Sequence, residues 1–151
     1  MLQRFEAFVT GVTVCHRYIQ RIKSVEMTEF GLKGAHVMCL FYLHHNPQGL
    51  TAAQLCQLCA EDKAAISRTL VTLQDRGYIR TGERKYRFPL QLTEAGKAIA
   101  RQLDTLIQQW VGLGGDGLTD EERAVFYKAL SHIAGNLQQK LDCAAQDGKE
   151  I

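Results

Sequence analysis

The chain has 151 residues, of which 46% are apolar, and its formal net charge is only +2. These values fit one compact folding unit and exclude a disordered or fibrous chain. The longest apolar run, residues 37–43, is far shorter than the ~20 residues that span a bilayer. The cysteines are odd in number and no signal peptide is visible, so we expect a soluble cytoplasmic protein without a disulfide framework.

The first part of the chain carries apolar side chains at alternating spacings of three and four, which predicts a helix up to about Lys23 with one narrow apolar stripe. The stripe consists of Phe5, Phe8, Val12, Cys15, Ile19 and Ile22. Such a stripe packs lengthwise on another helix, either in the same chain or in a second subunit. Residues 24–34 predict a turn, and a second helix follows from about residue 32 to His45, where Asn46-Pro47-Gln48-Gly49 ends it.

Residues 50–96 predict two short helices followed by a two-stranded hairpin, which is the plan of a winged helix-turn-helix. Thr51 and Gln54 have the spacing of a capping box that starts the first short helix. Its buried face is predicted to consist of Leu55, Leu58 and Cys59.

Asp62 is placed to cap the second short helix, and Gly77 is placed to end it. Spacings of four and three put Ile66, Leu70 and Leu73 on its core side. The flanks and the outer face then carry Lys63, Ala64, Ser67, Arg68, Val71 and Thr72. Two short strands are expected at residues 78–80 and 88–92.

Two long amphipathic helices are predicted after the hairpin. Thr93 caps the first, which glycines between residues 112 and 117 end, and Thr119 and Glu122 form a capping box for the second. Their apolar stripes consist of Ile99, Leu103, Leu106, Trp110 and Leu113, and of Phe126, Leu130, Ile133, Leu137 and Leu141. Together with the first helix, these two helices carry more apolar surface than the core of a small winged helix needs.

The positive charge lies in the middle of the chain, since residues 51–97 hold eight basic against five acidic residues, whereas residues 116–151 hold four against seven. A helix face with donors and small residues suits the major groove, and a cationic hairpin suits the DNA backbone. The candidate DNA-binding residues are Thr51, Lys63, Ala64, Ser67, Arg68, Thr72, Arg80, Arg84, Lys85 and Arg87. The alternative is a winged helix that uses this surface to bind a protein and not DNA.

These segments resemble the MarR family of bacterial transcriptional regulators. LTAAQLCQL is similar to the first helix of its DNA-binding domain, DKAAISRTLVTLQDRGYI to its recognition helix and next strand, and LTEAG to the start of its fifth helix. The wing departs from the family, because Arg84-Lys85-Tyr86-Arg87 stands where an Asp-x-Arg pair is usual. Arg87 is the best candidate for an arginine that enters the minor groove.

The resemblance implies a mainly α fold with a two- to three-stranded β wing. Its parts would be an N-terminal dimerisation helix and linker (1–30), a winged helix-turn-helix domain (31–97) and C-terminal dimerisation helices (98–151). It also implies a homodimer that binds a palindromic operator in double-stranded DNA, with Phe5, Phe8, Val12, Ile133, Leu137 and Leu141 in the dimer interface. We expect a repressor that a small molecule releases, and not an enzyme.

Family members often bind phenolic or other aromatic acids between the dimer helices and the DNA-binding domain. Here His16, Arg17, His36 and Tyr42 are candidate polar ligands for such an effector, among the apolar Phe5, Phe8, Met38 and Trp110. Cys56 and Cys59 have the spacing of a redox or zinc pair, but no second pair of ligands follows. No metal or cofactor is expected, and a thiol-based redox regulator on the same scaffold is an alternative reading.

Overall fold

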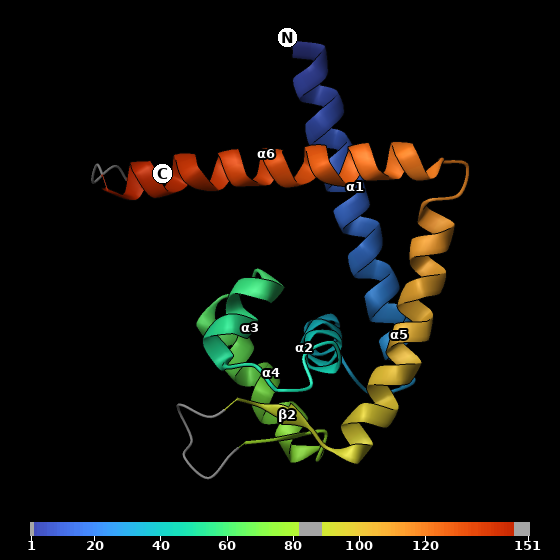
Figure 1. The fold of residues 1–151 in the computed structure, drawn as a ribbon, viewed down its shortest axis with the longest axis vertical. Coiled ribbons are helices and arrows are strands. Elements are labelled where there is room, and N and C mark those ends of the chain that lie inside the picture. The colour runs from blue at the N-terminus through green and yellow to red at the C-terminus, as the bar shows by residue number, and fades with distance from the viewer. Residues whose placement is uncertain (1, 82–88, 147–151) are drawn as a thin grey trace. The chain divides into compact units, whose positions relative to one another are not determined.

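The computed structural model describes residues 2–81 and 89–146, in which six helices and two short strands are present (Figure 1). In chain order the elements are α1 (Leu2–Met27), α2 (Gly34–His44), α3 (Ala52–Cys59), α4 (Lys63–Asp75), β1 (Ile79–Arg80), β2 (Gln91–Leu92), α5 (Glu94–Gly114) and α6 (Asp120–Gln146). This confirms the predicted fold class, a mainly α winged helix-turn-helix with flanking long helices. None of the described helices combines the length and the apolar character that a membrane crossing requires.

Two compact units make up the chain, residues 1–107 and 108–151. The boundary falls inside α5. The division at residues 30 and 97 stays a prediction. In the first unit α1 contacts α2, and its last residue, Met27, is completely buried. The helix therefore continues to Met27, beyond its predicted end near Lys23, and the connecting turn starts later.

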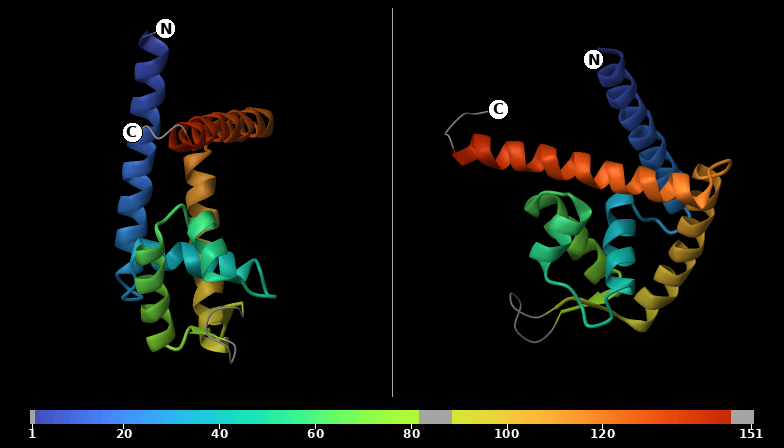
Figure 2. Two further views of the ribbon diagram at one scale, coloured as in Figure 1. Left: turned by 90° about the vertical axis from the view of Figure 1, so that its left-hand side faces the viewer. Right: turned by 45° about the horizontal axis from the view of Figure 1, so that its top comes forward.

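Helix α2 is the centre of the first unit, because α1, α3, α4 and β2 all contact it (Figure 2). Buried apolar side chains from several of these elements pack around this helix. The core side chains of α2 are Val37, Cys39, Leu40 and Leu43, and Leu55, Ile66, Leu73, Leu90, Leu92 and Leu103 from other elements are buried in the same cluster.

Helix α3 corrects one prediction, because Leu58 is 41% exposed whereas Leu55 is completely buried. Half-buried Cys56 and Cys59 lie on the buried side with Leu55. Successive residues of an α-helix are rotated by ~100° about its axis, so Leu55, Cys56 and Cys59 lie on one side of α3. Leu58 is rotated by more than a quarter of a turn from the middle of that side. The short helix therefore offers the core a leucine and two cysteines, and its second leucine faces outward.

The two strands form an antiparallel pair in which Ile79 faces Leu92 and Arg80 faces Gln91. An isolated bridge between Leu50 and Leu90 extends this pairing to a third segment. Hydrogen bonds from Leu50 N to Leu90 O (3.1 Å) and from Leu90 N to Leu50 O (2.8 Å) hold the start of the helix-turn-helix against the hairpin. The hairpin base is thus a fixed part of the first unit.

Candidate nucleic-acid interface

Helix α4 begins at a cap that the sequence predicted. The carboxylate oxygen Oδ1 of Asp62 accepts a hydrogen bond of 2.7 Å from Ala65 N, which satisfies one of the free donors of the first turn. Ile66, Thr69 and Leu73 are buried on the inner side of the helix. Because the cap and these contacts fix the start and the rotation of α4, its opposite face is directed outward.

The outward face of α4 carries the predicted DNA-reading side chains. Lys63, Ala64, Ser67 and Arg68 are all exposed, and each lies in the first half of the helix. Thr72 is half-buried, and its hydroxyl donates to the Arg68 carbonyl oxygen at 3.1 Å. The accessible donors of this face are therefore Lys63, Ser67 and Arg68, while Ala64 leaves space for close approach.

Thr51 serves the start of α3. Its hydroxyl oxygen accepts from Gln54 N at 3.2 Å, and the Gln54 side-chain oxygen Oε1 in turn accepts from Thr51 N at 2.9 Å. Both halves of the predicted capping box are thus present. The hydroxyl also lies 2.9 Å from Gln54 Oε1, so its donor is directed to the cap.

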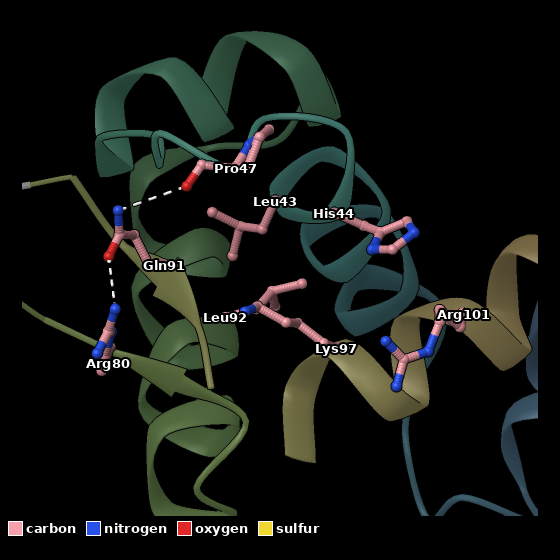
Figure 3. A pocket seen from close by; sticks show the side chains of 8 residues that line it. All are labelled: Leu43, His44, Pro47, Arg80, Gln91, Leu92, Lys97 and Arg101. Carbon is pink, nitrogen blue, oxygen red and sulfur yellow. Dashed lines mark hydrogen bonds between the residues drawn. The ribbon is translucent and has the colours of Figure 1, made fainter. Parts of the chain in front are cut away.

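The base of the hairpin forms a polar clamp around Gln91 (Figure 3). Arg80 Nη2 donates to Gln91 Oε1 at 3.0 Å, and Gln91 Nε2 donates to the carbonyl oxygens of Pro47 (3.4 Å) and Gln48 (3.3 Å). This clamp joins β1, β2 and the loop after α2. Arg80 is thereby held in one orientation at the edge of the wing, although it remains exposed.

A cavity of about 300 Å³ lies beside this clamp, on the side of α2 and α5 (Figure 3). Its lining residues are Leu43, His44, Pro47, Arg80, Gln91, Leu92, Lys97 and Arg101. Arg80, Lys97 and Arg101 give the lining a positive character. Lys97 also pairs with Glu94 Oε1 at 2.7 Å, but an exposed pair of this kind screens only part of that charge.

Sequence reasoning missed Gln91, Lys97 and Arg101 as members of this surface. The two cations are four residues apart on α5, so their common face was readable from the sequence. The clamp was not readable, because it joins residues more than forty positions apart. The three predicted wing contacts Arg84, Lys85 and Arg87 lie outside the described residues.

The four candidate effector ligands occupy different environments. His16 and Arg17 are exposed on α1, where the Arg17 guanidinium lies 5.3 Å from the centre of the Tyr18 ring. His36 is only 7% exposed, and its ring nitrogen Nδ1 accepts from Lys33 N at 2.7 Å. Tyr42 is half-buried against the core, and burial raises its pKa. None of the four lines the cavity of Figure 3.

Burial lowers the pKa of His36, and the nearby cations Arg76 and Lys33 lower it further. The neutral ring is the form that accepts the hydrogen bond from Lys33 N, as expected for a residue that completes the cap of α2. His36 therefore has a structural role in the described chain.

The predicted dimerisation residues are all solvent-exposed in the single chain. On α1, Phe5 is 65% and Val12 44% exposed, and on α6, Leu137 is 57% exposed. Phe8, Ile133 and Leu141 have exposed fractions between 36% and 47%.

Among the described residues, no group of three or more His, Cys, Asp or Glu side chains is arranged to hold a metal ion. The five cysteines are all free thiols, and Cys59 contacts Cys39 of α2. The thiol contact in the fold therefore joins Cys59 to a cysteine of another helix, and not to Cys56 in the CxxC sequence of α3.

Comparison with known proteins relates this interface to one family. The model of the MarR family matches residues 30–85, from the turn before α2 into the hairpin. No curated protein sequence matches the chain.

Solved structures extend the likeness to nearly the whole chain. A MarR-family regulator from Listeria monocytogenes, solved with a 26mer DNA, is 20% identical, covers 95% of this chain and 96% of its own, and superposes with a TM-score of 0.82. A MarR-family regulator from Silicibacter pomeroyi is 26% identical over 90% of this chain and 92% of its own, with a TM-score of 0.74. A MarR protein from Peptoclostridium difficile is 20% identical over 89% of both chains, with a TM-score of 0.79.

Proposed function

We propose that the chain is a winged-helix protein of the MarR family and a sequence-specific DNA-binding transcriptional regulator, which its match to the family model over residues 30–85 and its fold support. The observation that carries the proposal is the outward face of α4. Lys63, Ser67 and Arg68 are exposed there on a helix whose start is fixed by Asp62. Arginine and lysine donors at the N-terminal half of a helix are the groups that read guanine edges in the major groove.

The wing base supplies the second part of the interface. Arg80, fixed by Gln91, and the cavity cations Lys97 and Arg101 add positive charge beside the hairpin. Cations at fixed positions suit phosphate contacts, which position a protein on DNA without reading sequence. Arg84, Lys85 and Arg87 would extend this charge along the wing.

A binding assay on duplex DNA from upstream of the protein's own gene tests the proposal. Arg68→Ala is expected to weaken binding by about 1–3 kcal/mol, which is roughly five- to 150-fold, because a base-reading contact is lost. Lys128→Ala is the matched control, since it removes one exposed cation from α6 and leaves α4 intact. Equal affinity of wild type and Arg68→Ala for the duplex would contradict base reading by α4. If the wild type showed no salt-sensitive binding to duplex DNA, the protein-interaction alternative would be favoured.

The proposed DNA-bound form is a homodimer on a palindromic operator. It is supported by the exposed apolar stripes of α1 and α6, because large exposed apolar patches mark interaction surfaces. Leu137→Lys is expected to shift sedimentation from dimer to monomer, whereas Gln139→Lys on the same helix is expected to leave the dimer intact. A wild-type chain that sediments as a monomer at micromolar concentration would contradict this part of the proposal.

We further propose that the chain is a repressor which a small aromatic acid releases. It is supported by the family resemblance and by the polar groups of His16 and Arg17, which are exposed on α1. Salicylate as a probe is expected to lower the DNA affinity of the wild type. DNA affinity that does not change up to saturating salicylate would remove aromatic acids of this size from the proposal.

A further inference from the structure

Two cysteines from different helices meet inside the first unit. Cys39 lies on α2 and is completely buried, while Cys59 is the last residue of α3 and is half-buried. Their sulfur atoms are 3.9 Å apart. A disulfide needs a separation of about 2.05 Å, so a closer approach of about 1.9 Å converts this contact into a covalent bond. Free cysteines are common in cores, where they behave as small apolar residues, but here a second thiol lies within reach.

The surroundings of the two sulfurs are unequal. The pKa of Cys59 is lowered, first because of its hydrogen bond with the Cys39 thiol and also because of the Lys23 ammonium; burial and the Glu61 carboxylate act in the opposite direction. The pKa of Cys39 is raised, first by that same hydrogen bond and then by its burial. Cys59 is thus both the more accessible sulfur and the one that more readily becomes a thiolate, which is the nucleophilic form.

We propose that Cys39 and Cys59 are a redox-active pair that a hydroperoxide converts into an intramolecular disulfide, with Cys59 as the attacking sulfur and Cys39 as the resolving one. In the first step the Cys59 thiolate attacks the peroxide oxygen, the O–O bond breaks, and Cys59 becomes a sulfenic acid while the peroxide leaves as an alcohol or water. In the second step the Cys39 sulfur attacks the Cys59 sulfur, the S–O bond breaks, and water leaves. The two thiols are oxidised by two electrons and the hydroperoxide is reduced by two.

The position of Cys59 links this pair to α4. Ala60 follows it in a left-handed conformation (φ 52°), and Asp62 then caps α4. Drawing Cys59 toward α2 moves the end of α3 and the turn on which that cap depends. If the proposed DNA-binding function holds, the disulfide form is expected to bind DNA about tenfold more weakly than the dithiol form.

The reduced full-length protein treated with hydrogen peroxide tests the pair directly. Peptide mapping is expected to find Cys39 joined to Cys59, and a thiol reductant is expected to restore both thiols. Cys59→Ser should form no such bond, and Cys39→Ser should stop at a sulfenic acid that dimedone traps on Cys59. Cys56→Ser is the matched control on the same helix and should form the bond as the wild type does.

The two readouts distinguish this inference from the function on which it rests. If the wild type, which needs no substitution to fold, forms no Cys39–Cys59 bond, the redox pair is refuted whatever the DNA assay gives. If the bond forms and both redox forms bind DNA equally, the link to α4 is refuted. If the bond forms but the dithiol protein does not bind DNA, the proposed DNA-binding function fails while the redox pair stands.

Discussion

Replacing Gly96 with alanine is expected to destabilise the protein, although alanine is the better helix former. Gly96 is buried in the first turn of α5, directly against the backbone of Tyr78, the residue before β1. A Cβ atom at this position would overlap the Tyr78 carbonyl oxygen and lie 2.9 Å from the carbonyl carbon. Both atoms belong to backbone, so a change of side-chain rotamer cannot relieve the overlap.

The size of the effect follows from the contacts at this junction. Thr93 N donates to Tyr78 O at 3.0 Å, and the Thr93 hydroxyl donates to Gly77 O at 2.6 Å. Separating α5 from β1 strains or breaks these bonds, and overpacking of this kind costs about 1–3 kcal/mol, with about 1 kcal/mol for each lost hydrogen bond. The better helix propensity of alanine returns about 1 kcal/mol. The net destabilisation is about 2 kcal/mol.

Gly112 in the same helix is the matched control, because a Cβ atom there meets no other atom within 4 Å. Gly112→Ala is expected to stabilise the chain by up to about 1 kcal/mol. Thermal unfolding followed by circular dichroism, at one protein concentration, should show a decrease in Tm of about 4–8 °C for Gly96→Ala and none for Gly112→Ala. A Gly96→Ala protein as stable as the wild type would refute the close approach of α5 and β1.

Two further substitutions test the caps that position α2 and α4. Asp62→Ala is expected to cost about 1 kcal/mol in urea unfolding and to weaken DNA binding, whereas Glu61→Ala, its exposed neighbour, should do neither; equal effects of the two would contradict the cap. Because the folded-state pKa of His36 lies below its unfolded value of about 6.5, its contribution to stability is complete above that pH and is lost as pH falls toward the folded-state pKa. His36→Gln keeps an acceptor for Lys33 N, so between pH 7 and 5 it should lose less stability than the wild type does. An equal loss in the two proteins would refute the contribution of neutral His36 to stability.

Sequence reasoning was most reliable where the physical cause is local. The caps at Thr51, Asp62 and Thr119 depend on side chains within three residues of the donors that they satisfy, and all three are present. The winged helix-turn-helix order follows from the same local patterns. The outward face of α4 was readable as well, because the buried positions Ile66 and Leu73 fix its rotation.

What the sequence did not reveal depends on contacts between distant segments. Leu58 has the spacing of a buried residue, but the side from which α2 covers α3 decides that it is exposed. Cys39 and Cys59 are twenty positions apart on different helices, and no spacing rule pairs them. The Gln91 clamp joins the hairpin to a loop that precedes it by more than forty residues. In each case tertiary packing determines which residues meet, and local sequence propensity does not predict these contacts.

The apolar stripe of α6 bears on the proposed homodimer. α6 has 27 residues, and none of its described side chains is buried. Intrinsic propensity contributes little to a helix in water, and most helix stability in proteins comes from packing of an amphipathic face. Leu137 and Phe126 are 57% and 54% exposed, so this face lacks that packing in the described chain. In the homodimer proposed above, a second copy of the chain would supply an apolar surface that packs on this face and stabilises α6.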